Sequence, residues 1–145
     1  MNKFFSKKIF IALISLAVFL YFSLNIFSYF DPLSFCRIKI HQQPLSGNRS
    51  TIKEALRYIK RSDPSSYAMV CKYVKDIGEK NCMSGDARVD ASFAGEYGTV
   101  KGCYVRGTKF IYLKPNKNND RQTVVERAKN VIHLAAKSEN FWQKY

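Results

Sequence analysis

The sequence has few of the side chains that enzymes most often use for catalysis. Its 145 residues include two histidines, and its 11 acidic residues are outnumbered by 24 lysines and arginines. No intact catalytic motif is present, and no two cysteines have the C-x-x-C spacing that is typical of zinc ligands. No internal repeat or low-complexity segment is visible either. The sequence alone therefore does not establish a biochemical activity.

One long segment lacks charge altogether. From Ile9 to Phe30 the chain is mostly apolar, whereas Lys3, Lys7 and Lys8 precede it without any acidic residue. As a helix, these residues would extend roughly 33 Å, which is enough to cross the apolar core of a bilayer. The segment predicts a transmembrane signal-anchor, and the three lysines favour a cytoplasmic N-terminus.

This interpretation divides the chain into a basic flank (1–8), an anchor (9–30) and an extracytoplasmic domain (31–145). We expect a single-pass protein of the cytoplasmic or inner membrane. Two alternatives stay open. A signal peptidase could cleave near Ser28, although the aromatic residues there suit a membrane interface better than a cleavage site. Cys36 could be lipidated, but the bulky Phe35 precedes it where a lipoprotein signal needs a small residue.

The positive charge restricts the class of partner. The whole chain has a net charge of +13, so the part after the anchor carries about +10. A basic domain next to a membrane favours the lipid bilayer itself, anionic headgroups or wall polymers as partners, and a protein partner stays open. We expect no nucleic acid, because the compartment is unsuitable and no basic run is interleaved with aromatics. A lysine-rich surface without a dedicated anion site is the simpler alternative.

All four cysteines follow the apolar segment. An even number of cysteines in an oxidising compartment predicts two disulfides, for which three pairings are possible. We favour Cys71 with Cys82 and Cys36 with Cys103.

The remaining pattern predicts an α+β domain with about three helices and a short antiparallel sheet. Thr51 or Ser50, followed by Glu54, forms a capping-box pattern at a helix start, and Asp63-Pro64 marks the next start. The expected elements are a strand at 34–42, helices at 51–61 and 63–77, a strand at 88–93, a hairpin at 99–106 and 108–113 around Gly107, and a helix at 120–139. The last helix should bury Val124, Ala128, Val131, Ile132 and Ala135, and Phe141, Trp142 and Tyr145 could fold back onto the core.

This order of elements resembles that of small secreted or anchored zincin-type metallopeptidase domains. The resemblance includes Ala55-Leu56 through Asp63, Tyr67 and Val70, then Gly102-Cys103-Tyr104 and Ile111-Tyr112 before the last helix. In that family the last helix carries H-E-x-x-H, in which two histidines bind zinc and the glutamate is the general base. The corresponding window here is His133-Leu134-Ala135-Ala136-Lys137. The resemblance thus implies an inactive copy, because Leu134 replaces the base and Lys137 replaces a ligand.

Two hypotheses follow from these observations. The first is a non-catalytic binding or accessory domain with no cofactor and no metal, in which His133 is an ordinary solvent-exposed residue. The second is an extracytoplasmic hydrolase, with or without a metal, whose non-standard site around His133 would have Glu96, Glu126 and His133 as candidates. A pocket containing His133 and at least two acidic residues would favour the second hypothesis.

Overall fold

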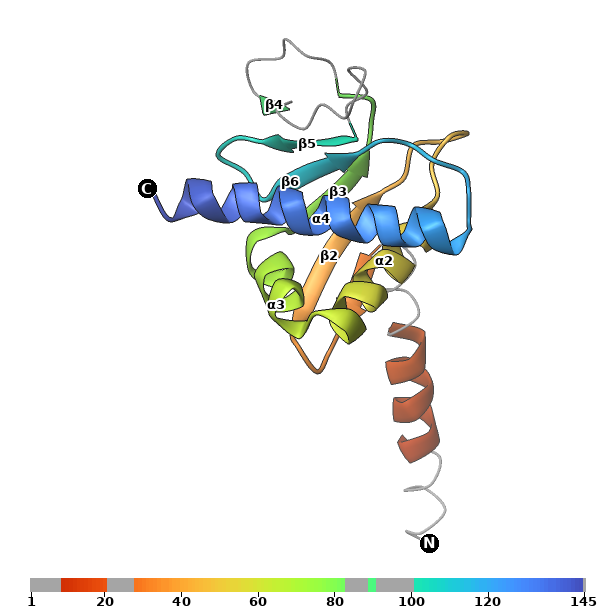
Figure 1. Cartoon of the computed structure of the whole chain (residues 1–145). Coiled ribbons are helices and arrows are strands. Elements are labelled where there is room, and N and C mark those ends of the chain that lie inside the picture. The colour runs from red at the N-terminus through yellow and green to blue at the C-terminus, as the bar shows by residue number, and fades with distance from the viewer. Residues whose placement is uncertain (1–8, 21–27, 83–88, 91–100, 145) are drawn as a thin grey trace, which may run out of the picture.

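The computed structural model describes residues 9–20, 28–82, 89–90 and 101–144 of the chain. Its centre is a sheet of six strands in the order β1-β2-β3-β6-β5-β4. The strands are β1 (Ser28–Asp31), β2 (Cys36–His41), β3 (Asp76–Glu79), β4 (Val89–Asp90), β5 (Gly102–Val105) and β6 (Phe110–Leu113). Three helices, α2 (Arg49–Ser62), α3 (Pro64–Tyr73) and α4 (Arg121–Trp142), cover one face of this sheet (Figure 1).

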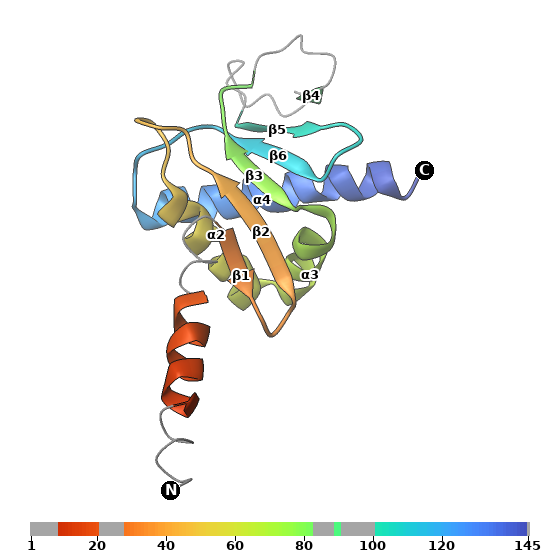
Figure 2. The ribbon, with the colours of Figure 1, turned by 180° about the vertical axis from the view of Figure 1, so that it is seen from behind.

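Among the described residues, no helix covers the opposite face of the sheet (Figure 2). Strand β2 shows why, because Cys36, Ile38 and Ile40 are buried while the residues between them are exposed. Such alternation gives a strand one apolar and one polar face, so only one face needs a covering layer. The core therefore lies between the sheet and the helices, and α4 packs against both α2 and α3.

The expected antiparallel sheet is wrong, because the sheet is mixed. Strand β3 runs parallel to both β2 and β6, whereas the β1–β2, β4–β5 and β5–β6 pairs are antiparallel. The expected second helix extended to Ile77, but α3 ends at Tyr73 and Ile77 lies in β3. Apolar residues at Val70, Val74 and Ile77 fit a helical repeat, and a four-residue buried strand is too short to override that pattern.

The predicted hairpin is confirmed by the antiparallel pair β5 and β6, with Gly107 in the turn. Its φ of 72° lies in the left-handed region, which glycine adopts without a steric cost. The C-terminal helix is also confirmed, with Asp120 as its N-cap. Phe141 and Trp142 lie in the last turn of this helix. Phe141 packs against the core, as expected, whereas Trp142 is 39% exposed, and Tyr145 lies outside the described residues.

The two other expected helix starts have different outcomes. Asp63 caps α3 by accepting a hydrogen bond from the Ser66 amide, with Pro64 in the first turn as predicted. The capping box of α2 is wrong, since its N-cap is Asn48, which accepts from the Thr51 amide.

The transmembrane prediction is also wrong. Within the part of the chain that the structure describes, no helix combines the length and the apolar character needed to cross a bilayer. Residues 9–20 are helical, but Phe30, the expected end of the anchor, lies in β1 and pairs with Arg37 of β2. The flanking residues of Phe30 explain this, because Tyr29 and Asp31 are buried and hydrogen-bonded to Tyr67. Lys3, Lys7 and Lys8 lie outside the described residues.

All four cysteines form disulfides, as predicted, but the favoured pairing is wrong. Cys36 bonds to Cys71 and joins β2 to α3, and Cys82 bonds to Cys103 at the start of the β5–β6 hairpin. Cys36 is fully buried. The pairing follows from the topology, since the crossing of α3 over the sheet places Cys71 above β2, which spacing along the sequence could not reveal.

Candidate functional site

The helix window that resembles a zinc site does not have the chemistry of one. His133 is exposed on α4, and Leu134, at the position of the family's catalytic glutamate, is fully buried in the core. Burial, reinforced by the positive charge of Lys137, lowers the pKa of His133. Within residues 9–20, 28–82, 89–90 and 101–144, no three His, Cys, Asp or Glu side chains are grouped as potential metal ligands.

The other two candidate residues do not join His133. Glu126 lies two turns before it on α4, about 10 Å along the helix axis, and forms an ion pair with Lys101 at 3.0 Å. Glu96 lies outside the described residues. Glu126 lines a cavity, but His133 does not, so the described residues bring the candidates into no common pocket.

The cavity beside Glu126 has a volume of about 390 Å³. It lies between the first half of α4, the start of β5 and the end of β6. Its lining is mostly polar. The side chains that determine its chemistry are those of Lys101, Lys114, Asn116, Glu126, Arg127 and Asn130. Three of these six carry positive charge and one carries negative charge, so the cavity favours anions over cations.

A buried ion pair forms one wall of this cavity. Arg127 Nη2 donates to Glu79 Oε1 at 2.5 Å, and both side chains are almost completely buried. The same guanidinium donates to the backbone carbonyls of Asn48 and Asn116, and the Asn48 amide donates to Glu79. The pair thereby ties β3 to the start of α2 and to the loop before α4. Buried charges need such partners, because removing one member leaves the other uncompensated.

Helix α2 carries a second charged feature, its basic face, which consists of Arg49, Lys53, Arg57, Lys60 and Arg61. The opposite stripe of α2, including Ile52, Leu56 and Ile59, is buried, as the sequence predicted. Glu54 is the one acidic residue of the helix and pairs with Arg57. Partial burial, together with the charges of Arg49 and Arg57, lowers the pKa of Lys53, so the positive charges on this face repel one another.

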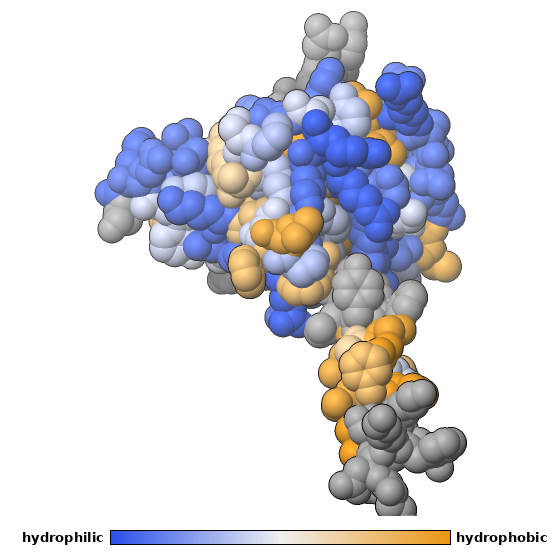
Figure 3. All heavy atoms as spheres, turned by 90° about the horizontal axis from the view of Figure 1, so that it is seen from below, coloured by the Kyte–Doolittle hydropathy of each residue, from blue (hydrophilic) through white to orange (hydrophobic). Residues whose placement is uncertain are grey.

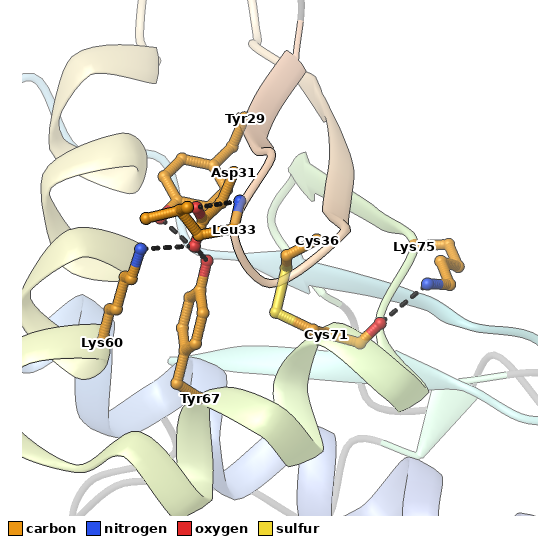
Figure 4. Close-up of a disulfide and its surroundings, with 8 residues drawn as sticks. All are labelled: Tyr29, Asp31, Leu33, Cys36, Lys60, Tyr67, Cys71 and Lys75. Carbon is orange, nitrogen blue, oxygen red and sulfur yellow. Dashed lines mark hydrogen bonds and ion pairs between the residues drawn. A yellow bond between two sulfur atoms is a disulfide. The ribbon is translucent and has the colours of Figure 1, made fainter.

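The basic face adjoins the point where the N-terminal segment enters the sheet. A cavity of about 420 Å³ lies there and is lined by β1 residues and by Lys53, Arg57, Lys60 and Arg61. Beside it, Asp31 accepts hydrogen bonds from Lys60 Nζ at 2.6 Å and from the Tyr67 hydroxyl at 2.8 Å (Figure 4). Burial raises the pKa of Asp31, but these hydrogen bonds outweigh burial and lower it to about 2. The carboxylate therefore fixes β1 to α2 and α3.

The sequence analysis did not identify Arg127, Glu79 or Asn130. Polar residues beside an apolar stripe are usually exposed, and Arg127 and Asn130 were therefore not expected in the core. The sequence contained one indication of their burial. Arg127 and Asn130 lie close to Ala128 along α4, so they extend the buried face of the helix beyond its apolar stripe.

Comparison with known proteins gives no relative for this chain. No protein-family model matches it, and neither a curated protein nor a solved structure does.

Proposed function

We propose that this chain is a non-catalytic binding domain that attaches to an anionic membrane surface through the basic face of α2. The observation that carries the proposal is the crowding of five cations on one helix with a single acidic residue. Arg57 pairs with Glu54 and Lys60 pairs with Asp31, and the charges of Arg49 and Arg57 add to burial in lowering the pKa of Lys53. Phosphate headgroups would attract this face, with about 1 kcal/mol for each lysine or arginine near the surface.

The exposed apolar side chains of residues 9–20 support a lipid partner over a soluble polyanion. Phe10, Ile11 and Phe19 have exposed fractions of 64%, 65% and 67%. In Figure 3 this helix forms a hydrophobic stretch beside a mainly hydrophilic domain surface. Strand β1 begins eight residues after Leu20, next to the basic face. Apolar groups would thus contact lipid where the cations contact headgroups.

A non-catalytic role is supported by the residues of α4. Buried Leu134 cannot accept a proton, and the ammonium group of Lys137 would repel a metal dication near His133. If α4 derives from a zinc-binding helix, as the zincin resemblance implies, these two substitutions removed its chemistry.

The proposal also includes an extracytoplasmic location for the domain. Two disulfides in one small domain are typical of proteins in oxidising compartments. An Asn118→Cys variant tests this location, because residue 118 is exposed. A membrane-impermeant thiol reagent should label it in intact cells. Labelling only after lysis would contradict the location.

Vesicle co-sedimentation of the full chain tests the binding function. We expect binding to vesicles of phosphatidylcholine with phosphatidylglycerol, which weakens as salt is raised. The Lys53→Gln/Arg57→Gln variant should bind about thirtyfold more weakly, since two cations contribute about 2 kcal/mol. Lys39→Gln/Lys129→Gln removes the same charge from exposed positions outside α2 and is the matched control. Equal losses for both variants would indicate net charge alone and contradict a role of the basic face. Preferential binding to soluble polyphosphate would replace lipid by a wall polymer as partner.

A further inference from the structure

The cavity between α4, the start of β5 and the end of β6 contains an unusual buried amide. Asn130 is 7% exposed and lines this cavity, on the same side of α4 as the core residues Val131 and Leu134. Within the described residues, its side chain has no hydrogen-bond partner. The Asn130 side chain lines the cavity, so a hydrogen-bond partner for it would lie in that space. A ligand in the cavity would provide the partner.

The charges around the cavity indicate which ligand would fit. Lys101 and Lys114 are exposed at its rim, and Arg127 lies in its wall. Arg127 already forms an ion pair with Glu79, and Lys101 forms one with Glu126. The charge that remains is that of Lys114, which suits a monoanion better than a polyphosphate. Arg127 Nε is enclosed by the protein and has no partner within the described residues.

The remaining wall is apolar and limits the size of the ligand. Leu113 and Pro115 line the cavity next to Lys114, where they would contact a short carbon skeleton. A volume of about 390 Å³ lies at the lower end of the range for small-molecule sites. A molecule of about ten heavy atoms would fit, whereas a folded partner would not.

We propose that this cavity binds a small organic monocarboxylate that also carries an amide group. Lys114 receives the carboxylate at the rim, Asn130 exchanges hydrogen bonds with the ligand amide, and Leu113 contacts its aliphatic carbons. This site is separate from the basic face of α2, and its existence does not depend on membrane binding. It gives the domain a second, small-molecule ligand.

NMR titration of the full chain with N-acetylalanine tests this inference, and N-acetylalanine amide is the uncharged control. We expect saturable shifts of the Asn130 side-chain amide and of the Lys114 backbone amide with the acid, and about tenfold weaker binding of the control. Asn130→Leu should weaken binding of the acid about tenfold, because it removes the hydrogen-bonding amide at similar volume. Lys129→Gln, at an exposed position of α4 outside the cavity, should bind normally.

Three results would overturn the site. These are the absence of saturable shifts, equal binding of the acid and its amide, or unchanged binding by Asn130→Leu. The last result, together with altered stability, would mean that Asn130 holds only a buried water molecule. If Asn130→Leu does not fold, Lys114→Gln provides the second variant, since Lys114 is exposed and its replacement leaves the core unchanged. Binding of the acid by Lys114→Gln at full affinity would likewise overturn the inference.

Discussion

Asp31 shows how a single buried carboxylate holds the first strand in place. Its oxygens accept hydrogen bonds from Lys60, Tyr67 and the Leu33 amide, while Tyr67 also bonds to the Tyr29 hydroxyl. Burial and these hydrogen bonds raise the pKa of Tyr67, so its hydroxyl remains a donor at all ordinary pH values. The network therefore depends on the charge of Asp31 rather than on that of Tyr67.

Acid should weaken the fold through Asp31. The pKa of Asp31 is about 2 in the folded chain and near 3.9 in an unfolded one. A lowered pKa gives stability that is present above about pH 4 and is lost as the pH falls towards about 2. The contribution is about 2 kcal/mol. Urea unfolding at pH 5 and pH 2.5 should show this loss in the natural chain.

The Asp31→Asn variant provides the comparison. It should be less stable at pH 5 and lose less stability between the two pH values, whereas Glu54→Gln, on the exposed side of α2, should keep the natural pH dependence. An Asp31→Asn variant with the full pH dependence would show that other carboxyl groups cause it.

His133 should behave as an exposed residue beside a cation. NMR titration should give a pKa below the ordinary value of about 6.5, and Lys137→Gln should raise it, because one cause of the lowering is the Lys137 charge. His133→Ala should change the free energy of unfolding by less than about 0.5 kcal/mol, as is usual for surface substitutions. Stoichiometric zinc that is lost in His133→Ala would contradict this interpretation.

At the scale of elements, β3 shows where prediction from the sequence reached its limit. Helical spacing identified the apolar face of α2, and Asp63-Pro64 identified the start of α3, because those signals are local. The central strand depends instead on parallel pairing with β2 and β6, which are distant in sequence. The disulfide pairing and the buried Arg127–Glu79 pair depend on the same long-range arrangement. Local patterns could not reveal any of them.

Gly78 of β3 should not tolerate a side chain. A Cβ atom there would lie 2.7 Å from the Tyr112 ring and 3.0 Å from that of Phe110. Gly78→Ala should therefore destabilise the domain by about 1 to 3 kcal/mol in chemical denaturation. The same substitution in a Tyr112→Ala background should cost less, because the closest ring is gone. An equal cost in both backgrounds would contradict the steric explanation.

The two disulfides should contribute comparable stability. They close loops with sequence separations of 35 and 21 residues, for which the chain-entropy relation gives about 4 and about 3 kcal/mol. Replacing either pair by alanines should lower the free energy of unfolding by about these amounts. Peptide mapping of the unreduced protein should find Cys36 with Cys71 and Cys82 with Cys103. A different pairing would contradict the placement of α3 over β2.

At the scale of the whole molecule, the two proposed binding regions use different elements. The helices cover one sheet face, with α2 at the β1 edge (Figures 1 and 2), and the cavity is lined by Lys101, by residues 113–116 and by the first half of α4. The net charge of +13 could be predicted to favour anionic partners, and the helix predicted at 51–61 already contains four of the five basic residues, all but Arg49. A membrane-bound domain would therefore adopt one orientation.

Paramagnetic relaxation measurements on the full chain, bound to vesicles that contain a gadolinium-labelled headgroup lipid, test this orientation directly. We expect the strongest signal loss at the exposed residues of α2, from Lys53 to Arg61, and little loss at the Gly107 turn, which lies at the other edge of the sheet. The Lys53→Gln/Arg57→Gln variant should lose this pattern. Uniform signal loss over all elements, or the strongest loss at the β5–β6 turn, would contradict the proposal that the basic face of α2 contacts the membrane.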